Sequence, residues 1–411
     1  MIQSIAGIFT LLIIAWLLSE NRRLVHWRTI LSGVALQVLI AFLMLKTPLF
    51  REIFLGLNAV VNAFQEATQA GTSFVFGYLG GGPLPFAEIR PGSSFSLAFQ
   101  SLPLVLVIAA LTALLYYWRI LPRVVQAFSW LLKKSMGIGG ALGVVASGSI
   151  FLGMIEAPLL IRPYLIKMTR SELFSMMTVG LSCIAGTMLV LYASVLQGVI
   201  PDAIGNILTA SIIHAPAALV LSAIMVPETM TQTLGEEIVP SQATSAMDAL
   251  TKGTLDGLQL LFNIIAILIV FVSLVKLTNI GLAQLPDMLG APLSLERILG
   301  ILMAPVVWLT GIPWEEAKTA GALMGTKVVL NEFLAYIELA KLPPAVLGAK
   351  SRLIMTYSMC SFANLGSLGI LIGGLGSLCP ERRDEIVAMG AKSLAAGVMA
   401  SLMTGAIVGL L

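Results

Sequence analysis

Long apolar runs separated by short polar stretches make up most of this chain, and this pattern predicts helices that span a membrane. A helix needs about 20 predominantly apolar residues to cross the hydrocarbon core of a bilayer. The strict alternation of apolar and polar residues that marks a membrane barrel does not occur in these runs. We expect spans at 2–19, 29–47, 97–118, 172–195, 205–226, 258–279, 351–378 and 384–410.

Three other stretches do not have the pattern of a span. Residues 51–68 and 121–136 alternate apolar and polar side chains at helical spacing, which predicts helices that lie at the membrane surface. Residues 228–254 form the most polar part of the chain, so we expect them to be a cytoplasmic connector.

Two further apolar segments are interrupted by glycine and proline. The segment 140–168 is broken at 153–158, and the segment 295–339 is broken at 311–316. Each half is too short to cross about 30 Å of hydrocarbon, so each segment predicts a helical hairpin that enters the membrane and returns. The backbone groups freed at each turn must then face protein, solute or water.

The span after each hairpin contains a break of its own, at 182–187 and at 361–367. Hairpin, broken span and final span therefore occur twice, and on the expected span count the hairpins enter from opposite sides, as in the inverted repeats of secondary transporters. We expect an all-α polytopic membrane protein with about eight transmembrane helices, two re-entrant helical hairpins in an inverted repeat, and interfacial helices. The expected domains are 1–136 (scaffold spans and interfacial helices), 137–227 (first hairpin repeat of the transport domain), 228–290 (cytoplasmic connector and scaffold span) and 291–411 (second hairpin repeat of the transport domain).

The composition agrees with a membrane location. Of the 411 residues, 58% are hydrophobic and 11% are charged, and the mean hydropathy is +0.96. A soluble domain carries about 25% charged residues. The net charge of +3 is too small to indicate nucleic acid as a partner. The three cysteines and two histidines form no zinc-binding or metalloprotease motif, so we expect no cofactor.

Lysine and arginine cluster in alternate loops, and this asymmetry orients the chain. The positive-inside rule makes such loops cytoplasmic. Both termini are then periplasmic, and the expected location is the inner membrane of a bacterium. The clusters are Arg22, Arg23 and Arg28; Arg119, Arg123, Lys133 and Lys134; and Arg382 and Arg383.

Two carboxylates lie inside apolar segments. A charge at the centre of a span costs at least about 2.5 kcal/mol, so such residues commonly serve a function. Glu156 lies at the first hairpin turn and Glu332 in the second hairpin segment, and both are candidate ligands for a hydroxyl-rich solute or for a proton. The alternative is a structural carboxylate paired with Arg162 or Lys327.

Nine short stretches, in order along the whole chain, together resemble the concentrative nucleoside transporter family. Any one of them alone would be a weak indication, whereas the full series is specific. The stretches are GTSFVFG at 71–77, LLYY at 114–117, IFLG at 150–153, EAPL at 156–159, RP at 162–163, SELF at 171–174, GIPW at 311–314, NEFLAY at 331–336 and SFAN at 361–364.

The resemblance implies a homotrimer whose scaffold spans hold the assembly together. In each protomer the two hairpin repeats would carry a nucleoside inward in elevator fashion, coupled to a cation. Residue by residue, the resemblance implies that Glu156 meets the nucleobase and that Phe362 lines the pocket. It also implies that Glu332, Asn364 and Ser367 bond the ribose hydroxyls.

The first hairpin turn departs from the family's pattern. The family usually has Gly-Gln-Thr-Glu where this chain has Gly153, Met154, Ile155 and Glu156. Two side chains that would bond the base are thus replaced by apolar ones, and each lost bond is worth about 0.5–1.5 kcal/mol net. We therefore expect an altered base preference or affinity, and the choice between purine and pyrimidine stays open.

The resemblance also implies a cation site formed by Ser149, Leu152, Cys183 and Ile184, between the first hairpin and the next span. The family usually has an asparagine and a serine where this chain has Ser149 and Cys183. Sodium prefers oxygen ligands, and a thiol is a poor substitute. The sequence therefore favours a proton as the coupling ion, carried by Glu156 or Glu332, with sodium as the alternative.

Two other functions compete with nucleoside transport. A symporter for another polar solute would also use hairpins, although carriers of anions need cationic or helix N-terminal groups at the site. An intramembrane enzyme would need a nucleophile–base pair or a metal set at membrane depth, and none stands out in the sequence.

Overall fold

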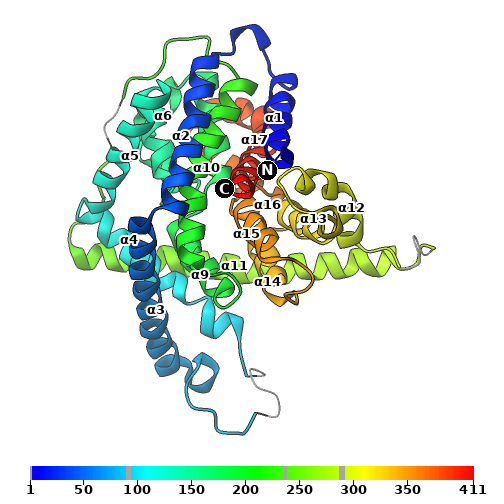
Figure 1. Cartoon of the computed structure of the whole chain (residues 1–411). Helices are drawn as coiled ribbons and strands as arrows, with labels where there is room; N and C mark the ends of the chain where they lie inside the picture. The colour runs from blue at the N-terminus through cyan, green and yellow to red at the C-terminus, as the bar shows by residue number, and fades with distance from the viewer. Residues whose placement is uncertain (1, 89–93, 236–237, 287–291) are drawn as a thin grey trace.

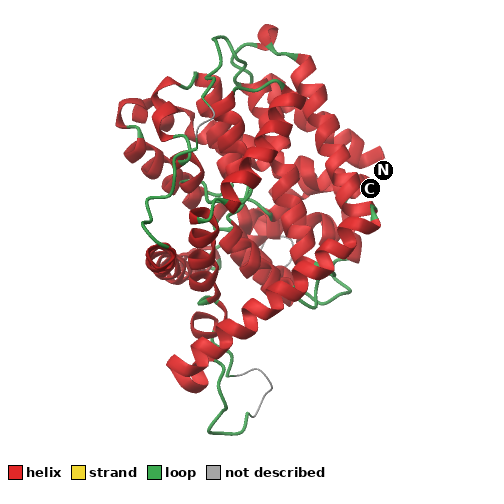
Figure 2. Cartoon of the chain, turned by 90° about the vertical axis from the view of Figure 1, so that its left-hand side faces the viewer, coloured by secondary structure: helices red, strands yellow, loops and turns green. Residues whose placement is uncertain are grey.

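The computed structural model describes residues 2–88, 94–235, 238–286 and 292–411, and all regular structure in these residues is helical (Figures 1 and 2). Six helical segments in the described part are long and apolar enough to cross a membrane. Two more apolar helices, at Ile2–Leu17 and Leu365–Leu378, are shorter. The prediction of an all-α polytopic membrane fold is confirmed. The six segments are Trp27–Lys46, Leu97–Tyr117, Arg170–Leu196, Ala203–Met225, Ala246–Leu282 and Pro380–Leu410.

The N-terminal part forms separate helices, several of them on the left-hand side of the molecule in Figure 1. The expected surface helix at 51–68 is part of a longer helix, α3, which begins at Pro48 directly after α2. The surface helix expected at 121–136 matches α5. The elements are α1 (Ile2–Leu17), η1 (Arg22–Leu24), α2 (Trp27–Lys46), α3 (Pro48–Phe76), η2 (Gly77–Gly80), η3 (Leu97–Ser101), α4 (Leu104–Tyr117) and α5 (Ile120–Met136).

The first hairpin and the span after it are both broken, as the sequence predicts. The hairpin runs down α6, turns without helix at 149–155, and returns through α7 and η4. The next span divides at 183–185 into α8 and α9. The elements are α6 (Gly140–Gly148), α7 (Glu156–Leu159), η4 (Arg162–Lys167), α8 (Arg170–Ser182), α9 (Gly186–Leu196) and α10 (Ala203–Met225).

The second repeat has the same succession, with its break in the span at 360–364. The long helix α11 lies crosswise to α2 and α10 and connects the two repeats (Figures 1 and 2). The expected domain boundary between 290 and 291 lies outside the described residues. The elements are α11 (Ala246–Leu282), α12 (Leu295–Trp308), α13 (Trp314–Val329), α14 (Glu332–Lys341), α15 (Ala349–Met359), α16 (Leu365–Leu378), η5 (Pro380–Arg382) and α17 (Arg383–Leu410).

The break predicted at 311–316 is present, but it is not the turn that carries Glu332, and the prediction missed a second break. That break is the turn between α12 and α13, where Gly311 adopts a φ of +110°. The chain breaks again at Leu330 and Asn331, and this second break puts Glu332 at the first residue of α14, as Glu156 is the first residue of α7. No glycine or proline marks the second break. It forms because the Asn331 side chain accepts a hydrogen bond from the Leu334 amide (2.9 Å) and so caps a new helix.

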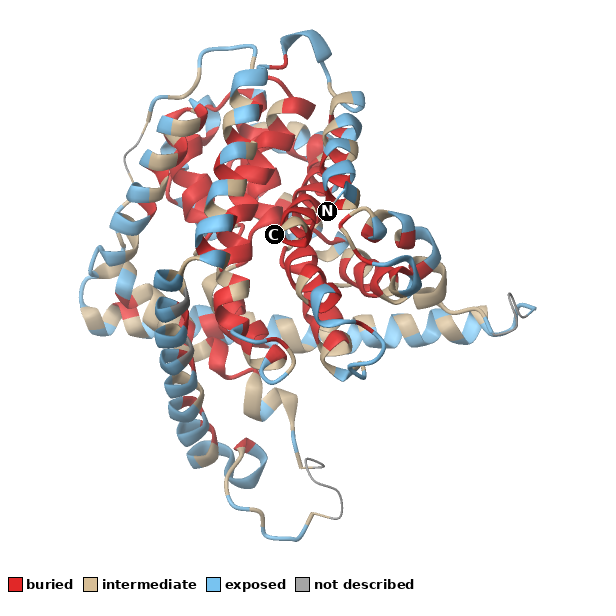
Figure 3. Cartoon of the chain, viewed as in Figure 1, coloured by how far each residue is buried: buried red, intermediate tan, exposed pale blue. Residues whose placement is uncertain are grey.

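The two repeats pack around α10, whose residues are almost all buried, and α17, most of whose residues are buried (Figure 3). Small residues let the backbones approach, as in other membrane bundles. A Cβ added at Gly397 of α17 would lie 3.2 Å from the Cβ of Ala363 and 3.3 Å from that of Leu181. In contrast, only 6% of the apolar window of α11 is buried, so this helix presents its apolar side chains outward.

Candidate functional site

Glu332 is the centre of a buried hydrogen-bonded cluster. Its carboxylate accepts a bond from the Tyr192 hydroxyl (2.5 Å) and one from the Asn364 amide nitrogen (2.9 Å). Glu332 is only 4% exposed and Asn364 only 2% exposed. The cluster therefore joins the second hairpin to α9 of the first broken span and to the break of the second.

Asn364 is held in place by the start of α16. It is the N-cap of that helix, and its side-chain oxygen accepts a bond from the Ser367 amide (2.7 Å). Because the oxygen is used for capping, the side-chain nitrogen must point toward Glu332. The structure thus brings Glu332, Asn364 and Ser367 together, the three residues for which the resemblance implies contact with the ribose.

The alternative partner for Glu332, Lys327, is engaged elsewhere. Its ammonium group donates to the Ser361 hydroxyl (2.6 Å) and to the Ala363 carbonyl (2.9 Å). Lys327 is fully buried, and no Glu332 oxygen lies within 4.0 Å of its nitrogen. Glu332 is therefore not one half of a simple structural ion pair.

Glu156 lies at the turn of the first hairpin, and its side chain is exposed. The carboxylate folds back over Gly153, where an added Cβ would lie 2.1 Å from Oε2 of Glu156. Arg162, its alternative partner, forms no ion pair with it in the structure. Gly153 is thus required by close approach, and the carboxylate stays open to a solute.

Met154 and Ile155 pack against glycines of neighbouring helices. An added Cβ at Gly180 of α8 would lie 3.3 Å from the Met154 Cβ, and one at Gly374 of α16 would lie 2.1 Å from the Ile155 Cδ1. Met154 is buried and Ile155 half-buried. These two side chains act as packing residues that fit the hairpin turn between α8 and α16.

The breaks of the two spans meet each other. The Phe362 amide donates to the Cys183 carbonyl (3.4 Å), and the Gly186 amide donates to the Phe151 carbonyl (2.8 Å). The Phe362 side chain is half-buried. The first hairpin, the first break and the second break are thus contiguous.

The four expected cation-site residues are all buried. The Ser149 hydroxyl donates to the Val145 carbonyl (2.9 Å), which leaves its oxygen lone pairs available. The Cys183 thiol donates to the Ser211 carbonyl (3.6 Å). Oxygen ligands at this place would therefore come from Ser149 and from backbone carbonyls of Leu152 and Ile184.

Sequence reasoning missed Tyr192 and underrated Lys327. Tyr192 lies within an apolar helix, and its role depends on which side chain it meets across the repeats. His214 lies within α10. Within the described residues, neither of its ring nitrogens has a hydrogen-bond partner, although it is fully buried.

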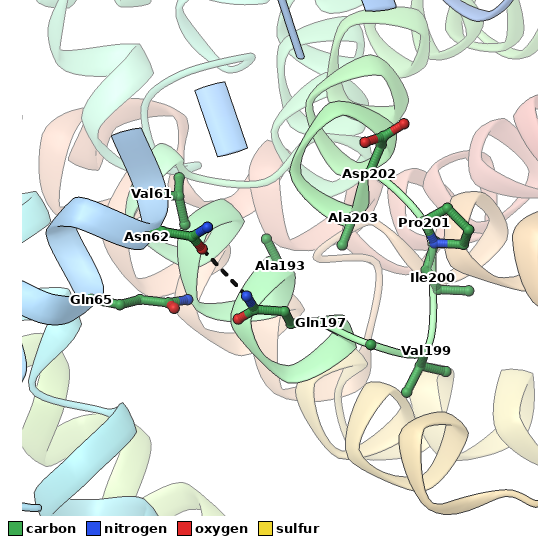
Figure 4. Close-up of a pocket in the computed structure, with 11 residues that line it drawn as sticks. Val61, Asn62, Gln65, Ala193, Gln197, Val199, Ile200, Pro201, Asp202 and Ala203 are labelled. Carbon is green, nitrogen blue, oxygen red and sulfur yellow. Dashed lines mark hydrogen bonds between the residues drawn. The ribbon is translucent and has the colours of Figure 1, made fainter. Parts of the chain in front are cut away.

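A separate cavity of about 380 Å³ lies between α3 and the loop from α9 to α10 (Figure 4). Asn62 and Gln197 face each other across it, and the Gln197 amide donates to the Asn62 side-chain oxygen (3.3 Å). None of the expected site residues lines this cavity.

Comparisons with known proteins identify the family of this chain. Family models described as "Na+ dependent nucleoside transporter N-terminus", "Nucleoside recognition" and "Na+ dependent nucleoside transporter C-terminus" match residues 6–79, 98–198 and 206–409. Nucleoside permease NupC of Helicobacter pylori is 36% identical over 413 residues, covering 99% of this chain and 97% of the permease. Human solute carrier family 28 member 3 is 34% identical, covering 99% of this chain and 59% of the human protein.

Solved structures lead to the same family. CNTnw in an inward-facing substrate-bound state has a TM-score of 0.90 and 34% identity, covering 100% of this chain and 98% of that chain. A CNTnw variant in an outward-facing state has a TM-score of 0.91 and 33% identity, covering 100% and 97%. These relatives are transporters and not enzymes, which removes the intramembrane enzyme from the candidate functions. The chain belongs to the concentrative, Na+-dependent nucleoside transporter family.

Proposed function

We propose that this chain, a cation-coupled nucleoside symporter by family, binds its solute where Glu332, Asn364 and Tyr192 meet. The hydrogen bonds that join these three side chains across the two repeats carry the proposal. A carboxylate, an amide and hydroxyl groups suit a solute rich in hydroxyls, because each can exchange a hydrogen bond with an OH group.

The ribose hydroxyls are proposed to form hydrogen bonds with the groups of this cluster that the protein itself leaves unused. A carboxylate has about four acceptor positions, and the protein fills one on each oxygen of Glu332. Within the described residues the Ser367 hydroxyl has no protein partner, so it is available to a second ribose hydroxyl. Bonds to a charged acceptor are worth about 1.5–3 kcal/mol each, enough to support micromolar-class recognition together with stacking on Phe362.

The nucleobase is proposed to meet Glu156, whose carboxylate is exposed at the hairpin turn. Met154 and Ile155 would contribute shape and no hydrogen bonds, since both pack on glycines. A base read by one carboxylate is discriminated less than one read by three polar groups. We therefore expect similar uptake of purine and pyrimidine nucleosides.

Transport is proposed to follow an elevator mechanism in a homotrimer in the inner membrane of a bacterium, with both termini periplasmic. Relatives solved in inward-facing and outward-facing states support a moving body. The exposed apolar face of α11 supports contacts with lipid and neighbouring protomers. A native mass of three chains in lipid nanodiscs is the expected result, and a fully active monomer would contradict the trimer.

For the coupling ion we propose sodium, bound by Ser149 and by the carbonyls of Leu152 and Ile184. Two observations support sodium: oxygen atoms that could serve as metal ligands lie at the first break, and the matching family is described as Na+ dependent. A proton carried by Glu332 or Glu156 is the second candidate, because a thiol stands at Cys183 where the family has an oxygen ligand.

The experiment is uptake of labelled uridine and adenosine into proteoliposomes under an imposed sodium gradient or an imposed proton gradient. Accumulation of both nucleosides under a sodium gradient alone is the expected result. Accumulation under a proton gradient alone would replace sodium by the second candidate. Accumulation of neither nucleoside under either gradient would overturn nucleoside symport.

A further inference from the structure

The ends of two helices face each other at the centre of the molecule. α8 ends at Ser182 and α15 at Met359, and their breaks touch through the Phe362 amide and the Cys183 carbonyl (3.4 Å). The last carbonyl groups of a helix lack partners within it and carry the negative end of the helix dipole. Two such ends buried together favour positive charge nearby.

At the second break this positive charge is supplied by the protein. Lys327 extends from α13, is fully buried, and donates to the Ser361 hydroxyl (2.6 Å) and the Ala363 carbonyl (2.9 Å). A hydroxyl and a carbonyl are the oxygen ligands that a hard metal cation would take. The ammonium thus occupies a cation-binding position and is covalently attached to the hairpin.

At the first break no protein cation is present among the described residues. Glu156 and Glu332 each begin the second helix of their hairpin, and Lys327 lies five residues before Glu332. Five residues before Glu156 stands Phe151, whose side chain is apolar and packs against Phe128 with ring centroids 5.6 Å apart. At the same sequence distance before the carboxylate, the first repeat thus has a phenylalanine, in the turn after α6, and the second repeat has a lysine, within α13.

We propose that Lys327 is a tethered counterpart of the coupling cation. It supplies the second break with the charge that the first break takes from a mobile ion. The inference rests on the proposed sodium symport and extends it. It assigns a single mobile cation to each solute, because the second position is permanently filled.

The first test is Lys327→Met in the full chain, reconstituted in proteoliposomes, with Lys318→Met on the exposed face of α13 as the control. At low sodium, uptake by Lys327→Met should fall at least tenfold. Raising sodium should restore part of it and raise the thermal unfolding midpoint, because the vacated oxygens then bind an ion. Lys318→Met should keep the sodium dependence of the original chain.

The second test is Phe151→Lys, which places a tethered cation in the first repeat. Nucleoside binding by this variant should no longer be strengthened by sodium. Binding that keeps its sodium dependence in Phe151→Lys would overturn the inference. So would a folded Lys327→Met with unchanged uptake, or one that no sodium concentration restores or stabilises.

Uptake measured with the unaltered chain distinguishes a failure of this inference from a failure of the symport assignment. Sodium-driven uptake by the unaltered protein supports symport whatever the variants do. Uptake driven by a proton gradient alone would leave the first break without a mobile metal cation. That result would overturn the tethered-cation inference while nucleoside symport stands.

Discussion

Glu332 illustrates how a buried carboxylate is held in a membrane protein by hydrogen bonds, without a direct ion pair. Its two oxygens are bonded by Tyr192 and Asn364, and the nearest buried ammonium, on Lys327, serves the neighbouring break. A carboxylate at membrane depth is costly unless hydrogen bonds or a nearby opposite charge compensate for its lost hydration. Here bonds from two helices hold it in a fixed orientation while leaving acceptor positions for a solute.

At this residue scale we predict different losses for Glu332→Gln and Tyr192→Phe. The glutamine removes the charge that strengthens each ribose bond, so nucleoside affinity should fall about 10- to 100-fold, since each such bond is worth about 1.5–3 kcal/mol. The phenylalanine removes one supporting bond, so the fall should be about threefold to tenfold.

Isothermal titration of the purified protein with uridine measures both losses. The matched comparison uses 2′,3′-dideoxyuridine, which lacks the ribose hydroxyls at issue. A Glu332→Gln variant that weakens both ligands equally would show that this carboxylate does not read the ribose.

The hairpins show how an element with few residues can present a functional group. α7 spans four residues, Glu156–Leu159, and depends on Gly153 for room. At the matching turn, α14 starts without a glycine because Asn331 caps it. Two different local devices thus place a carboxylate at the first residue of each second helix.

At the element scale we predict that Gly153→Ala reduces nucleoside affinity at least tenfold. The added methyl group would lie 2.1 Å from the Glu156 Oε2, so the carboxylate must leave its place. Gly369→Ala in α16 is the control, because an added Cβ there meets nothing within 4 Å. Binding of labelled adenosine measures the effect, and unchanged affinity in Gly153→Ala would argue against a role for that carboxylate position.

At the scale of the whole molecule, the proposed elevator requires the repeats to slide past the scaffold. α3 belongs to the expected scaffold, and the loop from α9 to α10 belongs to the first repeat. Asn62 and Gln197 join these two parts by a hydrogen bond at the cavity of Figure 4. A covalent cross-link between these two residues would fix α3 and the first repeat in one relative position.

We therefore predict that a thiol-specific cross-linker joining Asn62→Cys and Gln197→Cys abolishes uptake, and that cleaving a reducible linker restores it. The three native cysteines are buried, so the reagent should reach the new pair first. Each single cysteine variant should keep its uptake after treatment. Full uptake by the doubly linked protein would mean that α3 moves with the repeat.

Much of this protein could be predicted from its sequence, because lipid imposes simple rules on a chain. Apolar length decides what can span, and glycine and proline favour breaks in a span, so the fold class and the presence of the first hairpin were predictable. The turn itself lies at 149–155, a few residues before the predicted 153–158. The motif series that contains NEFLAY at 331–336 and SFAN at 361–364 indicated the family. The group of Glu332, Asn364 and Ser367 followed from that resemblance.

Only the tertiary structure decided how these parts meet. The second hairpin turn, at Leu330 and Asn331, carries no breaker residue and forms because a side chain caps the next helix. Tyr192 and Lys327 are an ordinary tyrosine and lysine until α9 and α13 bring them to the breaks. Local sequence patterns predict the helix or break that a segment forms by itself. A hydrogen bond between residues more than 100 positions apart, such as that of Tyr192 with Glu332, forms only when the helices have packed.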